Sequence, residues 1–242
     1  MVLDPNRYRL SDTENQAIFE REIKPALFAG AKASPYPVAV IFGGQPGAGK
    51  SIAADAAVRE LEQCGSVVKI EGDELRAYHP RHKELMARDD KTAAVYTGPD
   101  SGRWVERAIA QGKVLRVNMV IEGTMRSSDT VAATMQSLRA AGYAIEARAL
   151  AVSFRLSEQG ILQRYERQKA IRGFGRMTTP EAHKAAYDGM LLTLERIERD
   201  KLADRITIYR RGGQAIYTNQ LQGGQWVHQP QAKAVVEAER KR

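Results

Sequence analysis

Apolar positions recur along the chain in two patterns, and these patterns predict alternating helices and strands. Residues 11–29 are expected to form a helix, because their apolar residues share one helical face and Ser11 and Glu14 match a capping box. Residues 38–42 read Val-Ala-Val-Ile-Phe. An unbroken apolar run of this length is typical of a strand that is buried on both faces.

The same rhythm continues toward the C-terminus. Further helices are expected at residues 50–64, 92–111, 129–141, 157–170 and 180–200, and further strands at 67–70, 114–121, 143–152, 205–209 and 214–217. Alternating strands and helices predict an α/β fold with a mostly parallel central sheet and helices on both faces. We expect a helix and linker over residues 1–34, the main domain over 35–220 and a partly helical tail over 221–242.

Composition narrows the classes of function. The chain has 242 residues, of which 37 are Lys or Arg and 29 are Asp or Glu, so its net charge is +8. A basic chain suits phosphates, an acidic partner or nucleic acid, but no basic run is interleaved with aromatic residues, so nucleic acid is not favoured. With 43% hydrophobic residues and no long uncharged apolar run, the chain is expected to be globular and not membrane-bound. Cys64 is the single cysteine, and no secretory signal is visible. We expect a cytoplasmic protein, or one exported without a cleaved signal.

One motif carries specific chemistry. The pattern G-x-x-x-x-G-K-[ST] is matched by Gly44, Gln45, Pro46, Gly47, Ala48, Gly49, Lys50 and Ser51. It follows a predicted strand and precedes a predicted helix, which is the setting of a phosphate-binding P-loop. In such a loop Lys50 reaches the β- and γ-phosphates and the Ser51 hydroxyl ligates Mg²⁺. We therefore expect the chain to bind ATP or GTP with Mg²⁺.

An acidic residue follows the second strand of this unit. The strand at residues 67–70 leads into Glu71-Gly72-Asp73, and ligands of parallel sheets bind beyond the carboxyl ends of the strands. Asp73 is thus expected near the γ-phosphate, where a carboxylate can orient a substrate hydroxyl or accept its proton. Asp73 could instead cap the helix that begins at Glu74, and the two roles are compatible.

Two polar residues follow the third strand. Glu122 and Thr124 are expected at the same edge of the sheet, where a carboxylate and a hydroxyl can bind a polyhydroxyl substrate. Glu122 could instead help to position Mg²⁺, and Thr124 could cap a helix.

A glycine-containing basic segment predicts a mobile lid. Arg164 lies on a predicted helix, and Arg176 follows the loop Ile171-Arg172-Gly173-Phe174-Gly175. Lids over phosphoryl-transfer sites deliver arginines that balance the developing charge. The sequence alone does not separate this pair from Arg167, Lys169 and Arg172.

Taken together, these motifs resemble the zeta toxin family of P-loop kinases. Beyond the P-loop, the matching stretches are Gly72-Asp73-Glu74-Leu75-Arg76 with His79-Pro80, Trp104-Val105-Glu106, Ile121-Glu122-Gly123-Thr124 with Arg126, Arg164-Tyr165-Glu166, Arg176 with Thr179-Pro180 and Ala182-His183, and Ile208-Tyr209 with Tyr217. Their order extends over roughly residues 15–220. The resemblance implies a three-layer P-loop kinase domain over residues 35–220 with an arginine-bearing lid.

The resemblance also implies an activity. Family members use ATP or GTP to phosphorylate a UDP-sugar, in well-understood members the 3′-hydroxyl of UDP-N-acetylglucosamine, and this blocks cell-wall synthesis. A small antitoxin often neutralises them. By position, Asp73 matches the catalytic carboxylate, Lys50 and Ser51 match the phosphate and Mg²⁺ residues, and Arg164 and Arg176 match the lid arginines. The substrate-binding positions are matched by Glu106, Glu122, Thr124 and Arg126.

Two departures from the family pattern bear on these assignments. The loop between Arg164 and Arg176 is about one residue shorter than in the family, and residues 80–104 are little like other members. Two alternatives therefore stay open: a polynucleotide or nucleotide kinase of the same P-loop class, and a non-catalytic ATP-binding interaction module.

Overall fold

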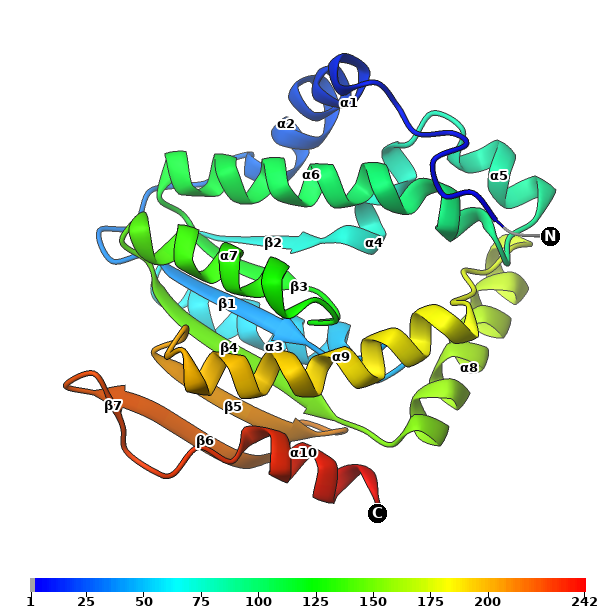
Figure 1. The fold of residues 1–242 in the computed structure, drawn as a ribbon. Helices are drawn as coiled ribbons and strands as arrows, with labels where there is room; N and C mark the ends of the chain where they lie inside the picture. Colours follow the sequence, from blue (N-terminus) through cyan, green and yellow to red (C-terminus); the bar gives the residue numbers. More distant parts are fainter. Residues whose placement is uncertain (1–2) are drawn as a thin grey trace.

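Five parallel strands form the centre of a single seven-stranded sheet in the computed structural model, which describes residues 3–242 (Figure 1). The strands are β1 Val38–Gly43, β2 Val67–Glu71, β3 Asn118–Glu122, β4 Ala144–Ala151, β5 Arg205–Arg210, β6 Ala215–Gln222 and β7 Gln225–Trp226. Their spatial order is β2-β3-β1-β4-β5-β6-β7. The first five are parallel, and β6 and β7 each pair antiparallel with the strand before. The expected terminal strand pair is confirmed, and the second strand of this pair extends to Gln222.

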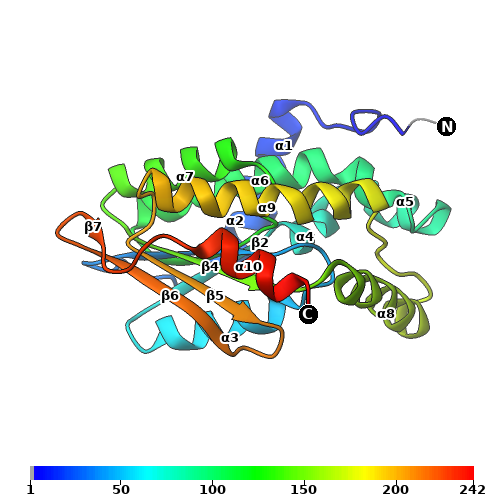
Figure 2. The same ribbon diagram turned by 60° about the horizontal axis from the view of Figure 1, so that its bottom comes forward.

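Helices cover both faces of this sheet. They are α1 Asp12–Ile18, α2 Lys24–Phe28, α3 Lys50–Glu62, α4 Gly72–Leu75, α5 His82–Arg88, α6 Ala93–Leu115, α7 Ser128–Ala140, α8 Phe154–Arg172, α9 Pro180–Arg199 and α10 Ala232–Arg240, with a π-helical turn η1 at Phe19–Ile23 and a 3₁₀ turn η2 at Arg76–Tyr78. Helices α6, α7 and α9 lie on one face and α3 on the other, so the predicted three-layer α/β fold is confirmed (Figure 2). Within residues 3–242 no helix combines the length and apolar character needed to cross a bilayer.

The apolar run of β1 supplies side chains to both faces of the sheet, as its continuous hydrophobicity predicts. Ala39 and Ile41 belong to the large core beneath α6, α7 and α9. Val40 and Phe42 point the other way and pack with α3. Because successive strand residues face opposite sides, a strand between two helical layers needs apolar residues at every position.

One predicted boundary is wrong. A strand was expected over residues 114–121, but α6 continues to Leu115 and β3 begins only at Asn118. The helix ends where Arg116 adopts a left-handed conformation with φ 53° and the Val117 amide donates to the Gly112 carbonyl. Val114 is apolar but 77% exposed. Val114 is thus an exposed apolar residue at the end of α6, and its apolar character makes the predicted start of β3 too early.

The first predicted helix is confirmed together with its capping box. The Ser11 side chain accepts from the Glu14 amide, and the Glu14 carboxylate accepts from the Ser11 amide. The helix is interrupted by a π turn at Phe19–Ile23, and Pro25 lies in the first turn of α2, where its missing N–H costs little.

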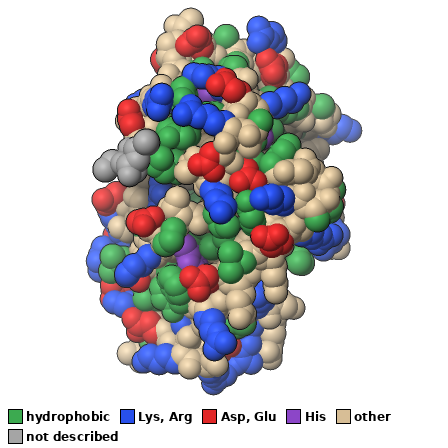
Figure 3. Space-filling model, turned by 90° about the vertical axis from the view of Figure 1, so that its right-hand side faces the viewer, with side chains coloured by type: hydrophobic (Ala, Val, Ile, Leu, Met, Phe, Trp, Pro, Cys, Tyr) green, Lys and Arg blue, Asp and Glu red, His purple; other side chains and the backbone are tan. Residues whose placement is uncertain are grey.

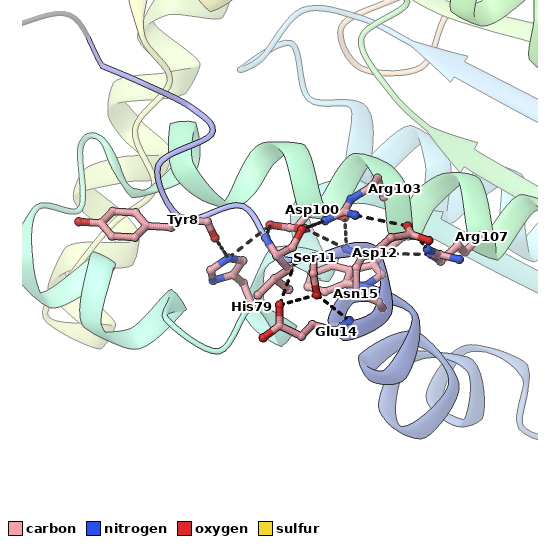
Figure 4. A network of polar contacts seen from close by, with 11 residues as sticks. Tyr8, Ser11, Asp12, Glu14, Asn15, His79, Asp100, Arg103 and Arg107 are labelled. Carbon is pink, nitrogen blue, oxygen red and sulfur yellow. Dashed lines mark hydrogen bonds and ion pairs between the residues drawn. The ribbon is translucent and has the colours of Figure 1, made fainter.

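A buried polar network fixes the N-terminal segment to α6 (Figure 4). The Asp100 carboxylate is fully buried and accepts from the Leu10 amide and the Asn15 side chain, while Arg103 forms an ion pair with it. His79 lies against the same carboxylate at 3.4 Å. A buried carboxylate is tolerated only when it is paired and hydrogen-bonded, so this network specifies where the segment docks.

We predict that Asp100→Ala lowers the free energy of unfolding by about 3 kcal/mol, because it removes the carboxylate that pairs with Arg103 and accepts from the buried Asn15 side chain and the half-buried Leu10 amide. Urea denaturation at pH 7 measures this. Asp12→Ala is the matched control, since Asp12 pairs with the same Arg103 but is 82% exposed, and it should cost less than about 1 kcal/mol. Equal losses in the two variants would contradict the account of the network.

Candidate active site

The P-loop lies between β1 and α3 and is shaped by two close constraints. Gly49 caps α3 with φ 95°, a left-handed conformation that favours glycine. Gly47 has φ 79°, and a Cβ there would lie 1.9 Å from the Ser157 carbonyl oxygen of α8. A side chain at residue 47 would therefore push the loop away from α8. The Lys50 ammonium donates to the Gln45 carbonyl at 3.2 Å and so lies back along the loop.

The carboxyl ends of β2 and β3 bring acidic residues toward the loop, at the end of the sheet where α4 and α8 lie (Figure 1). Lys50 is half-buried and lies among the charges of Glu122, Asp73, Arg164 and Arg176. Burial lowers the pKa of Lys50, and the two carboxylates oppose that effect. Residues separated by more than 100 positions in sequence thus surround one ammonium group. We call Lys50, Asp73, Glu122, Arg164 and Arg176 the charge cluster.

Within the cluster, Asp73 is held by two arginines. Its carboxylate lies 2.6 Å from Arg176 Nη1 and 3.1 Å from Arg76 Nε. Burial alone would raise the pKa of Asp73, but the charges of Arg176, Arg76 and Arg164 outweigh it and lower the pKa to about 2. The N-cap of α4 is Glu71, so Asp73 does not cap this helix.

Glu122 differs from Asp73 because nearby cations do not outweigh the effect of burial on its pKa. Burial raises the pKa of Glu122, against the opposing charge of Lys50, and one carboxylate oxygen is buried without a hydrogen-bond partner in the described structure. An acceptor of this kind suits a hydroxyl of a ligand or a cation nearby.

The residues around Ser51 fit a magnesium ion that is bound largely through phosphates. The Ser51 hydroxyl lies 3.4 Å from the Glu71 carboxylate. Among residues 3–242 no three His, Cys, Asp or Glu side chains form a metal-binding group. Mg²⁺ at kinase sites commonly takes only one or two protein ligands and obtains the rest from phosphates and water. Ser51, with Glu71 beside it, meets that requirement.

The structure separates the lid arginines from their basic neighbours. Arg164 and Arg176 are half-buried and face the cluster, whereas Arg167, Lys169 and Arg172 are exposed. Burial together with the charge of Arg176 lowers the pKa of Arg164 to about 10, and its guanidinium donates to Thr178 Oγ1 at 3.2 Å. Sequence spacing could not make this distinction, because all five residues lie in one basic stretch.

Asp90 connects the lid to the loop before α6. Its carboxylate accepts from the Gly175 amide at 3.0 Å and from the Tyr165 hydroxyl at 3.1 Å. Both donors lie in the segment that carries Arg164 and Arg176, so Asp90 helps to place that segment over the site.

The remaining predicted substrate residues lie outside the charge cluster. Glu106 is exposed on α6, one position beyond Val105, which faces Gly72. Thr124 is half-buried in the loop after β3, and Arg126 is exposed. Thr124 is not the cap of α7, which is Ser127. Within residues 3–242, neither Glu106 nor Arg126 forms an ion pair with a member of the cluster.

Arg76 is not among the predicted site residues, although it contacts Asp73 directly. Its guanidinium also donates to the Ala94 carbonyl and to Thr97 Oγ1, so it joins Asp73 to the start of α6. The sequence does contain a signal for it, because side chains three positions apart share a helix face.

Comparison with known proteins agrees with this geometry. The family model described as zeta toxin matches residues 26–222. The chain belongs to the zeta toxin family. It is 32% identical over 208 residues to toxin PezT of Streptococcus pneumoniae serotype 4, covering 86% of this chain and 81% of that protein. It is also 32% identical over 207 residues to toxin zeta of Enterococcus hirae, covering 84% and 72%.

A solved structure shows the same fold. A chain from the PezAT chromosomal toxin–antitoxin system of Streptococcus pneumoniae superposes with a TM-score of 0.74 at 27% identity, covering 96% of this chain and 97% of that chain. The resemblance to zeta toxins expected from the motifs is therefore confirmed, and with it the P-loop kinase-like fold.

For this zeta toxin family protein, we predict that Arg176→Met raises the pKa of Asp73 from about 2 toward its ordinary value, because the nearest compensating charge is removed. Nuclear magnetic resonance titration of the Asp73 carboxyl carbon measures the pKa directly. The folded-state pKa lies below the unfolded one, so ionised Asp73 stabilises the fold above about pH 4, and this contribution is lost as the pH falls toward 2.

Arg167→Met is the control for this titration, since Arg167 is an exposed arginine of α8, the helix that leads into the loop carrying Arg176. It should leave the pKa of Asp73 unchanged. An equal shift in both variants would show that net charge, and not the Arg176 contact, sets the pKa.

Proposed function

We propose that this protein is a kinase that transfers the γ-phosphoryl group of ATP or GTP to a sugar hydroxyl. The carrying observation is that Asp73 lies with Arg164 and Arg176 around the P-loop lysine, Lys50. Nucleotide binding alone needs the loop and its lysine. A carboxylate with two arginines beside the position of the γ-phosphate is what transfer to an acceptor requires.

The mechanism assigns a role to each member of the charge cluster. Lys50 and the P-loop amides bind the β- and γ-phosphates. Asp73 accepts a hydrogen bond from the acceptor hydroxyl and aligns its oxygen with the γ-phosphorus. As that oxygen bonds to phosphorus, the bond from phosphorus to the β,γ-bridging oxygen breaks, ADP leaves, and the hydroxyl proton passes to Asp73.

The low pKa of Asp73 favours positioning over early deprotonation. A carboxylate with a pKa of about 2 is a weak base, so the proton leaves the hydroxyl only as the new P–O bond forms. Arg164 and Arg176 then stabilise the charge on the transferring group. Mg²⁺, which Ser51 with Glu71 would hold, supplies charge neutralisation between the phosphates when bound.

We further propose that the acceptor is the 3′-hydroxyl of UDP-N-acetylglucosamine and that the product blocks cell-wall synthesis, making the protein a toxin. Family membership supports this assignment. The buried, unpartnered oxygen of Glu122 offers a hydrogen-bond acceptor for a sugar hydroxyl. We propose that Glu106, Thr124 and Arg126 make further contacts with the substrate, as their positions in the family pattern imply. Lys and Arg are interspersed with Asp and Glu over the face in Figure 3, which does not favour a polyanionic acceptor.

A small antitoxin is the partner that the comparisons support. The matched PezAT structure is described as a toxin–antitoxin system. We propose that this chain is also neutralised by a small protein that covers the nucleotide site. With a net charge of +8, the chain would attract an acidic inhibitor electrostatically.

The direct test is to incubate the protein with ATP, Mg²⁺ and a panel of UDP-sugars, nucleosides and oligonucleotides, and to identify the acceptor that gains one phosphate by mass spectrometry. We expect UDP-N-acetylglucosamine to be modified. Asp73→Asn should lower the transfer rate by about 100-fold or more while the protein stays folded. Asp188→Asn, an exposed carboxylate on α9, is the control and should keep the full rate.

Phosphorylation of a different member of the panel would refute the acceptor but not the kinase activity. Full-rate transfer by Asp73→Asn at saturating ATP would refute the role of Asp73. ATP binding without transfer to any member would favour a non-catalytic module.

A further inference from the structure

A buried arginine near the C-terminus contacts the P-loop. Arg240 lies in the last turn of α10 and is only 7% exposed. Its Nη2 donates to Gln45 Oε1 at 3.2 Å, across 195 positions of sequence. Helix α10 packs against α9, β4 and β5 (Figure 2).

Gln45 is the P-loop residue that receives this contact, and its side chain is fully buried. Its Nε2 donates to the Val152 carbonyl at 2.7 Å and lies 3.2 Å from Ser157 Oγ. A guanidinium can only donate, so it fixes which end of the Gln45 amide faces α10. The other end must then face Val152.

The main chain of Gln45 belongs to the same arrangement. Its carbonyl accepts from Lys50 Nζ at 3.2 Å, and it also accepts from the Ala48 amide. The Gln45 side chain is held by Val152 after β4, by Ser157 of α8 and by Arg240 of α10. These contacts fix the position of the Gln45 main-chain carbonyl and so the curvature of the loop.

Docking of α10 does not by itself require the contact between Arg240 and Gln45. A half-buried ion pair between Arg210 and Glu239 already joins α10 to β5 at 2.7 Å. Burial lowers the pKa of Arg240, and its Nε is buried without a partner in the described structure, so the guanidinium is retained despite a desolvation cost. Stacking on Tyr187 at 3.7 Å and donation to the Tyr187 carbonyl at 2.8 Å hold it in place.

We infer that Arg240 is a positioning residue for the nucleotide: through Gln45 it keeps the P-loop in its phosphate-binding shape. This inference rests on the proposed binding of ATP at the P-loop. It assigns helix α10 a part in the nucleotide site, although no atom of α10 need touch the nucleotide.

Isothermal titration calorimetry with ATP and Mg²⁺ tests this without any acceptor. Arg240→Ala should weaken ATP binding about tenfold, the effect of losing about 1.4 kcal/mol of binding free energy. Arg240→Lys keeps the charge but not the fork that reaches Tyr187 and Gln45 together, so it should lose most of the same affinity. Glu239→Gln loosens the docking of α10 without touching Gln45, and should bind ATP as the wild type does.

A double-mutant cycle separates positioning from a general loss of stability. In a Gln45→Ala background, Arg240→Ala should weaken ATP binding little further, because the contact is already absent. Thermal unfolding establishes that each variant is folded at the assay temperature. If Arg240→Ala is unfolded at that temperature, the comparison of Arg240→Lys with the wild type is the test.

The outcomes are distinct. Wild-type affinity in folded Arg240→Lys and Arg240→Ala, or an equal loss in Glu239→Gln, overturns the inference and leaves the proposed kinase untouched. An independent, additive effect of Arg240→Ala in the Gln45→Ala background also overturns it. Absence of binding of both ATP and GTP by the wild type would overturn both proposals.

Discussion

The ion pair between Asp73 and Arg176 joins the two halves of the candidate site. Asp73 follows β2, and Arg176 belongs to the lid between α8 and α9, and their charged atoms lie 2.6 Å apart. Without this ion pair, Asp73 would be a half-buried carboxylate with less compensating charge, and the neighbouring arginines would repel one another more strongly. A phosphoryl group that enters the site must share the same arginines. The pair is therefore both the link that orders the lid and the electrostatic feature that a nucleotide has to alter.

The parallel sheet explains why these groups meet. Strands β1, β2 and β3 are neighbours and end at the same edge, so the P-loop, Asp73 and Glu122 converge there. Apolar side chains on both faces of β1 and β3 bury the centre of the sheet between α3 and the layer of α6, α7 and α9. The rigid layers fix the strand ends, and the arginines arrive from helix α8 and the loop after it. The geometry of the candidate site thus follows from the strand order at one edge of the sheet and from a separate lid.

Local patterns predicted much of the architecture and little of the long-range pairing. The apolar run of β1, the capping box at Ser11 and the P-loop are encoded by adjacent residues, and each is found as expected. The start of β3 was predicted too early because Val114, an apolar residue, is exposed at the end of α6. Lys50, Asp73 and Glu122 could be proposed from strand ends, and Arg164 and Arg176 from the basic segment that predicts a lid. The contact of Arg240 with Gln45 could not, because it depends on how α10 docks, and no local pattern encodes that.

The central claim is that the arginines of the charge cluster are shared between Asp73 and the γ-phosphate. Its most direct test is the pKa of Asp73, followed by carboxyl-carbon resonance with saturating Mg²⁺ complexes of ADP and of the non-hydrolysable β,γ-imido analogue of ATP. The triphosphate analogue should raise the pKa of Asp73 above its nucleotide-free value of about 2, and ADP should raise it much less. The same pKa with both nucleotides bound would mean that the γ-phosphate lies away from Asp73, and would contradict the account.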